Sequence, residues 1–187
     1  MKYIFTLLAV FAFTISYAQA SSAEEQSSIL VKQGKVVLEK ELDLIIDSKS
    51  AYQILRLWAK DNYGRDPFIS SVRYDNQGKF ITAKSRIELL LPPDSKNIRE
   101  KIVMRYRIDA SIANGKCVVT FREIAYLYEN PQKPHFLPKI SKAEELITDQ
   151  ALSLKDSQSE LRSNVRKSTL YFISQTTQEL DLRLHGK

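Results

Sequence analysis

The side chains best suited to nucleophilic or metal chemistry are few in this sequence. It contains one cysteine, Cys117, and two histidines, His135 and His185. A reactive thiol needs an exposed, electropositive setting. Cys117 instead follows an Asn-Gly pair on the apolar side of an expected strand, where a thiol behaves as a small core residue. The alternative is a nucleophile paired with His135. The histidines lie in a proline-rich loop and near the C-terminus, so we expect no zinc site.

Motifs that define known reaction centres are missing from the sequence. We find no HExxH, CxxC or EF-hand loop, and no GxSxG, SxxK, P-loop or GxGxxG pattern. Acyl transfer and phosphoryl transfer therefore have no support. We expect no metal, no cofactor and no enzymatic activity.

One acid, Glu123, falls on an otherwise apolar face. If Asn114-Gly115 closes a hairpin through a two-residue turn, Tyr106 lies opposite Glu123. An inward carboxylate with a raised pKa would be a candidate acid or base. The alternative is a position at the sheet margin, where the carboxylate bonds the phenol or reaches water. We favour the second interpretation, because structural polar pairs also have shifted pKa values.

Basic side chains gather on the opposite face of the same expected sheet. Alternation places six of them there: Arg73, Lys84, Arg86, Arg105, Arg107 and Arg122. Arg107 directly opposite Arg122 is unfavourable unless an anion lies between them. The face therefore predicts contact with an acidic glycan or an acidic protein partner. The alternative is a solvated face that is neutralised by acids of the chain, such as Glu39 and Glu41.

The hairpin that carries these residues spans about 100–129. Its alternation pairs apolar residues on one face, and the pairs are Ile112 with Cys117, Ala110 with Val119, Ile108 with Phe121, Met104 with Ala125, and Ile102 with Leu127. A slip of one residue would mix the two faces, so the register is well specified. One apolar and one polar face is typical of an antiparallel sheet that is covered on one side.

The remaining elements complete a two-layer domain. The pattern predicts a strand over 36–46, a helix from an Asp47 cap to about 62, a hairpin of 68–74 with 79–91, a short helix capped by Ser141 and Glu144 that runs to about 154, and a long helix over 159–184. Five antiparallel strands with two main helices on one face give a single α+β domain over 34–187.

The first twenty residues have the pattern of a secretory signal peptide. Lys2 precedes an apolar run over 3–15. Two candidate cleavage sequences with small residues at the determining positions follow, and they end at Ala18 and at Ala20. The run is shorter than the ~20 residues that a spanning helix needs, which disfavours an uncleaved anchor. We expect cleavage near Ala18 or Ala20, a flexible lead-in over 21–33, and a periplasmic or secreted bacterial protein. Membrane contact would then be limited to the signal peptide.

Charge and cysteine content limit the function classes further. A formal net charge of +6 is mild and does not imply nucleic-acid binding, which export also disfavours. A single cysteine excludes an intramolecular disulfide, so a packed core must hold the fold.

Four stretches of the chain form a recognisable pattern: the signal peptide ending in YAQ, LEKELDLII followed by SAYQILRLWAKDNY, GKFITAKSRIEL, and MRYRIDASIANGKCVVTFREIAY. In these stretches the chain resembles a secreted Bacteroidetes domain-of-unknown-function family with a TBP-like fold. The resemblance covers about 36–128 well and the C-terminal helix loosely. It implies a curved sheet, related to helix-grip folds, with the five strands in the order 1-5-4-3-2 and both main helices on the concave side. It implies no functional residue.

Two hypotheses for function follow. The first is a non-enzymatic exported binding module that uses the basic face. The second is a carrier of small hydrophobic ligands, with a cavity between the sheet and the C-terminal helix.

Overall fold

The computed structural model describes residues 29–128 and 139–186. Its main sheet has the strand order β3-β7-β6-β5-β4, and β8 pairs with the end of β7. The strands are β3 (Leu38–Asp43), β4 (Ser70–Asp75), β5 (Phe80–Leu90), β6 (Lys101–Ala113), β7 (Lys116–Tyr128) and β8 (Lys139–Lys142). The order of the five predicted strands and the α+β class are confirmed, and β8 adds a sixth strand.

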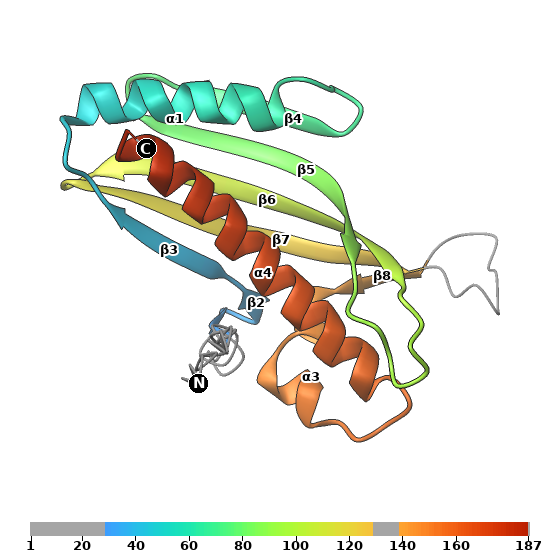
Figure 1. Ribbon diagram of the computed structural model, residues 1–187. Helices are drawn as coiled ribbons and strands as arrows, with labels where there is room; N and C mark the ends of the chain where they lie inside the picture. Colours follow the sequence, from blue (N-terminus) through green and yellow to red (C-terminus); the bar gives the residue numbers. More distant parts are fainter. Residues whose placement is uncertain (1–28, 129–138, 187) are drawn as a thin grey trace, which may run out of the picture.

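Among the described residues, four helices accompany the sheet, and the two long ones cover the same face of it (Figure 1). They are α1 (Ser48–Tyr63), α2 (Ala143–Leu146), α3 (Asp149–Ser153) and α4 (Ser159–Leu184). A small separate hairpin, β1 (Val31–Lys32) with β2 (Lys35–Val36), precedes the sheet. The described part of the expected lead-in thus differs from the expectation, because Ile29 is buried and Val31–Lys32 is paired. Residues 1–28 lie outside the described part.

Helix α1 begins as its sequence predicts. The Asp47 carboxylate accepts hydrogen bonds from the backbone N–H groups of Lys49 and Ser50, at 2.9 and 3.0 Å. These bonds satisfy donors that the first turn leaves without helical partners. The helix buries Leu55 and Trp58 against the sheet.

Helix α4 crosses the sheet diagonally, and its first turns extend past the strands (Figure 1). The sequence pattern of 159–184 predicts an inward side that contains Leu161, Val165, Phe172, Thr176 and Leu180. This is only partly confirmed, since the buried side of the helix includes threonines and arginines. Its buried residues are Arg162, Val165, Arg166, Thr169, Ile173, Thr177, Leu180 and Leu184. The threonine hydroxyls donate to carbonyls one turn earlier, as Thr169 does to Val165 at 2.8 Å. A polar side chain that is satisfied within its own helix can be buried at little cost.

The segment that follows β8 packs on the overhanging end of α4. Arg162 binds the Asp156 carboxylate at 2.6 Å, and Arg166 binds Asp149 at 2.5 Å. The prediction of one helix capped by Ser141 and Glu144 is wrong, because Ser141 lies in β8. Glu144 accepts instead from the backbone N–H of Val36 at 2.8 Å.

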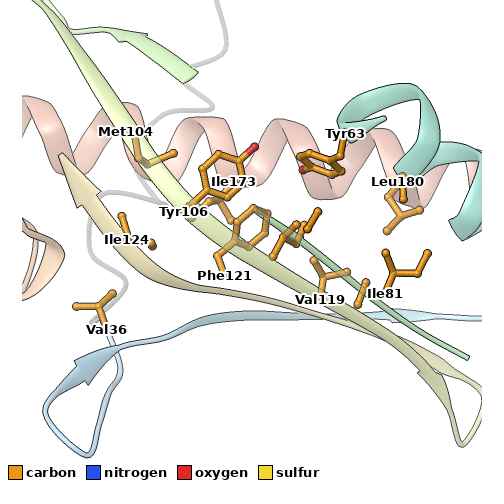
Figure 2. Close-up of a cluster of buried hydrophobic side chains, with 14 of the residues drawn as sticks. Val36, Tyr63, Ile81, Met104, Tyr106, Val119, Phe121, Ile124, Ile173 and Leu180 are labelled. Atoms are coloured by element: carbon orange, nitrogen blue, oxygen red, sulfur yellow. The ribbon is translucent and has the colours of Figure 1, made fainter. Parts of the chain in front are cut away.

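Side chains fill the centre of the interface between the sheet and α4 (Figure 2). The ring of Tyr106 lies 5.9 Å from that of Phe121 and 5.3 Å from that of Phe172. The Tyr126 hydroxyl, also buried, lies 2.8 Å from that of Thr169. A closed ligand cavity at this centre would need these rings to move apart.

Within the described residues, no helix is both long and apolar enough to cross a membrane.

Candidate functional site

The outer face of the sheet, away from the helices, is shaped by a bulge between β6 and β7. The predicted register holds from Ala113 opposite Lys116 to Arg107 opposite Arg122, and then shifts so that Arg105 lies opposite Ala125. Glu123 has a positive φ of 53°, as expected for an extra residue in a bulged strand. Beyond it the inward residues are Ile124 and Tyr126, not the predicted Ala125 and Leu127.

The predicted pair of Tyr106 and Glu123 is therefore wrong. Tyr106 stays in the core, whereas the Glu123 carboxylate reaches the outer face and accepts from Lys84 at 3.1 Å and from Arg107 at 3.3 Å. The hydrogen bond from Lys84, with the smaller contribution of Arg107, lowers the pKa of Glu123. A carboxylate held in its charged form is a counter-ion and not a proton donor.

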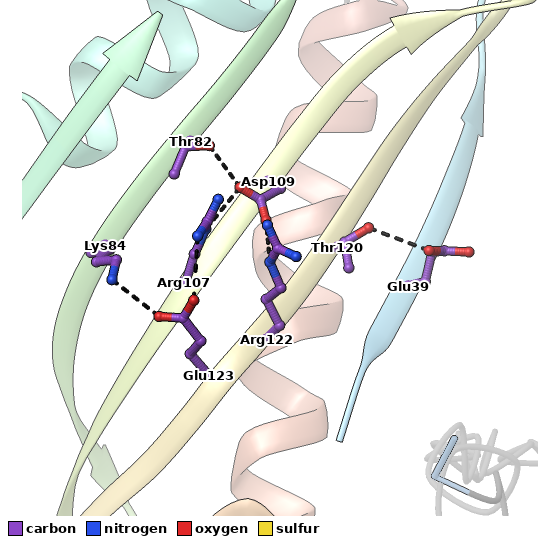
Figure 3. A network of polar contacts seen from close by, with 8 residues as sticks. All are labelled: Glu39, Thr82, Lys84, Arg107, Asp109, Thr120, Arg122 and Glu123. Atoms are coloured by element: carbon purple, nitrogen blue, oxygen red, sulfur yellow. Dashed lines mark hydrogen bonds and ion pairs between the residues drawn. The ribbon is translucent and has the colours of Figure 1, made fainter. Parts of the chain in front are cut away.

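A second carboxylate, Asp109, lies between the two arginines that face each other (Figure 3). It accepts from Thr82 at 2.7 Å and from Arg107 Nε at 3.1 Å, and its other oxygen lies 2.5 Å from Arg122 Nε. These side chains cover it so completely that Asp109 is buried on the outer face. The anion expected between Arg107 and Arg122 is thus supplied by the chain itself.

Acids of β3 neutralise the neighbouring part of this face. Lys116 Nζ lies 2.5 Å from Glu41, and Lys32 lies 3.9 Å from Glu39. Thr120 also donates to Glu39 at 3.4 Å. The alternative of a salt-bridged face therefore describes this half of the surface well.

The other half carries a line of cations, which we call the cationic row: Arg86, Arg105 and Lys142. Arg86 on β5 lies opposite Arg105 on β6, Arg105 lies opposite Ala125 on β7, and Ala125 lies opposite Lys142 on β8. Residues opposite each other project from the same face, and strands are ~4.8 Å apart, so the row spans roughly 14 Å. All three cations are exposed, and no hydrogen bond or ion pair joins their side chains to another described residue.

A hollow of about 380 Å³ adjoins the row. Arg86 and Arg105 line it together with Phe68 and Ile69, which precede β4. Phe68 is 88 % exposed, an unusual position for a phenylalanine ring. The hollow therefore combines unpaired guanidinium groups with an apolar wall.

The six predicted basic residues all line the outer face, but they fall into two groups. Lys84, Arg107 and Arg122 are neutralised by Glu123 and Asp109. The others, Arg73, Arg86 and Arg105, have no such partner among the described residues. Arg73 lies apart from the cationic row, beside a separate hollow of about 430 Å³.

Sequence analysis missed Lys142. The pattern Ser-x-x-Glu at 141–144 pointed to a helix cap, and this hid a four-residue strand. No pattern marked the strand, because its one apolar residue, Ile140, is exposed while Ser141 is buried.

The remaining candidates for chemistry have structural roles where they are described. Cys117 is buried, and burial raises the pKa of its thiol to about 12. His185 ends α4, with Nδ1 2.9 Å from the Asp181 carbonyl. His135 lies outside the described residues. Within residues 29–128 and 139–186, no group of three or more His, Cys, Asp or Glu side chains is arranged to hold a metal ion.

Comparison with solved structures identifies the architecture. A TBP-like protein from Parabacteroides distasonis superposes with a TM-score of 0.71 at 23% identity, over 84% of this chain and 97% of that one. The chain has a TBP-like fold. A DUF4468 family protein from Bacteroides ovatus gives a TM-score of 0.66 at 18% identity, over 83% of this chain and 90% of that one. Neither description names an activity.

These likenesses confirm the resemblance to Bacteroidetes proteins of unknown function at the level of the fold. No family model matches the sequence, and no curated protein matches it. The function of the TBP-like chain must therefore be argued from its own surface.

Proposed function

We propose that this protein is an exported, non-enzymatic binding module that holds an acidic partner against the outer face of its sheet. The observation that carries the proposal is the cationic row, in which Arg86 and Arg105 face each other and neither forms an ion pair with a described carboxylate. The nearby Glu123 is engaged by Lys84 and Arg107. Two like charges directly opposite each other destabilise a strand pair. A bound anion relieves this repulsion, so part of the binding free energy comes from the protein itself.

The neighbouring rows support this interpretation by contrast. At the pair Arg107–Arg122 the chain places the buried Asp109, and at Lys84 it places Glu123. The same sheet therefore neutralises Lys84 and Arg107 and leaves available the next outward pair, Arg86 two residues later on β5 and Arg105 two residues earlier on β6.

The partner is an acidic glycan or an acidic protein. A carboxylate or sulfate group can accept two parallel N–H bonds from one guanidinium group. Two arginines about one strand spacing apart suit closely spaced anionic groups, and exposed Phe68 offers an apolar surface beside them.

A carrier of small hydrophobic ligands is the second candidate. It is favoured by one observation, an open and largely apolar groove of about 510 Å³ beside α4. The groove lies at the margin of the helix–sheet interface and not at its filled centre.

Charge reversal tests the first proposal. We expect Arg86→Glu/Arg105→Glu to abolish capture of an acidic partner from an envelope fraction and to leave the melting temperature within a few degrees. The matched control, Lys49→Glu/Lys155→Glu, changes the net charge equally at exposed sites outside the sheet. Capture should also weaken with salt, because exposed charges are screened over ~8–10 Å. Loss of capture by both variants, or retention by both, contradicts a site at the row.

A further inference from the structure

We infer that the groove beside α4 binds a single-chain amphiphile with an anionic head group, such as a long-chain carboxylate. This site shares no residue with the cationic row, so the inference is independent of the acidic-partner proposal. It assigns a ligand class to a surface at the margin where α4 meets the end of β5.

The groove is bounded by two walls that are fixed to each other. One wall is the end of β5 with the following Pro92-Pro93, and the other is the middle of α4. Ser168 donates to the Leu90 carbonyl at 3.1 Å, and Asn164 donates to the Pro92 carbonyl at 3.4 Å. Because these bonds tie helix to strand, the groove is held open at about 510 Å³, within the ~300–1,000 Å³ usual for small-molecule sites.

The walls expose apolar surface that nothing in the described chain covers. Leu90 is 52 % exposed and Tyr171 is 64 % exposed, although both line a recess. The apolar lining continues inward through Ile87, Leu89 and Phe172. An alkyl chain lying in the groove would remove this surface from water, which is the main source of affinity for such ligands.

The charges at the groove favour an anionic head group. Arg99 and Lys167 line it, and no hydrogen bond or ion pair joins Arg99 to another described residue. Among the lining residues, Glu88 is the sole acid, and Lys101 binds its carboxylate at 2.6 Å. The lining of the groove therefore carries a net positive charge, which fits a carboxylate head group and opposes a quaternary ammonium group.

Calorimetric titration of the full chain with sodium dodecanoate, below its micelle concentration, tests the inference. Dodecyltrimethylammonium has the same alkyl chain and the opposite head group. We expect one dodecanoate per chain, and at least tenfold weaker binding of the ammonium compound. Leu90→Lys places a charge in the apolar wall and should abolish binding. Because Leu90 is exposed, circular dichroism should show an unchanged fold.

Arg99→Gln should weaken dodecanoate binding about tenfold, as expected for the loss of one charge-assisted contact. Arg73→Gln is the matched control, since it removes an exposed guanidinium group from the opposite face and should change nothing. Equal binding of both amphiphiles, or dodecanoate binding that survives Leu90→Lys, would overturn the assignment. Neither result would bear on capture by the cationic row.

Discussion

Two carboxylates, Asp109 and Glu123, determine which basic side chains of the outer face remain available to a ligand. Both bind Arg107, and between them they also engage Arg122 and Lys84. Six cations that look equivalent in sequence are therefore divided by contacts that only the folded chain creates. The division follows from the bulge, because without it Glu123 would project into the core.

At this scale the pH dependence of Glu123 can be predicted. Lys84 and Arg107 lower its pKa below the ordinary 4.5 in the folded state, so the unfolded chain takes up the proton first as pH falls. The contribution of Glu123 to the free energy of unfolding is complete above about pH 4.5 and is lost as pH falls through the folded pKa. Because the group is half exposed, we expect less than about 1 kcal/mol.

The measurement is urea unfolding of the wild type and of Glu123→Gln over a pH series. The variant should be less stable at neutral pH, and the difference should disappear in acid. A difference that does not shrink as the pH falls below 4.5 would show that Glu123 acts through packing and not through its charge.

At the scale of elements, sequence patterns predicted the strands and failed where both faces of a strand are apolar. Alternation fixed the hairpin correctly from its turn to Phe121. After Glu123 the chain continues as Ile-Ala-Tyr-Leu-Tyr, so either register places apolar residues inward. Alternation therefore does not reveal the one-residue register shift at the bulge. The positive φ at Glu123 was equally hidden, since glutamate is not a residue that marks such a position.

The buried side of α4 was mispredicted for a different reason. Thr169 and Thr177 satisfy their hydroxyls within the helix, and Arg162 and Arg166 are paired by acids of the preceding segment. Threonine and arginine therefore occupy buried positions, and the spacing of apolar residues alone does not predict their burial.

Helix α1 offers a direct test of core packing. Trp58 is 1 % exposed, and its ring lies 5.6 Å from that of Tyr63 in an edge-to-face arrangement. Trp58→Ala should lower the free energy of unfolding by about 3–5 kcal/mol, because a large cavity replaces the ring. Leu57→Ala, one residue earlier on the exposed side of the same helix, should cost less than about 1 kcal/mol. A small loss at Trp58 would mean that the helix does not pack as described.

At the scale of the whole molecule, the helices and the core occupy one side of the sheet, and the charged network and the cationic row occupy the other. Such a division suits a protein that meets its partner through a sheet face. Sequence alone predicted the basic face, but the row needed β8, the bulge and the strand order together.

Export is a separate prediction for the whole chain. We expect protein from its native host to lack residues 1 to about 20, because their pattern is that of a cleaved signal peptide. N-terminal sequencing or intact mass decides this. Retention of Met1 in a membrane fraction would contradict it.

We expect the unpaired cations of the row, and not the neutralised network beside them, to contact the partner. Two variants with equal charge change separate these alternatives: Arg86→Gln/Arg105→Gln removes two guanidinium groups from the row, and Arg107→Gln/Arg122→Gln removes two from the network. The measurement is affinity for immobilised polyglutamate at low salt, with urea unfolding of both variants.

We predict that the row variant binds at least tenfold more weakly with little change in stability. The network variant should bind as the wild type does but lose about 2–3 kcal/mol of stability, because the buried Asp109 then lacks its cations. Weak binding by the network variant together with unchanged binding by the row variant would show that the network, and not the row, contacts the partner.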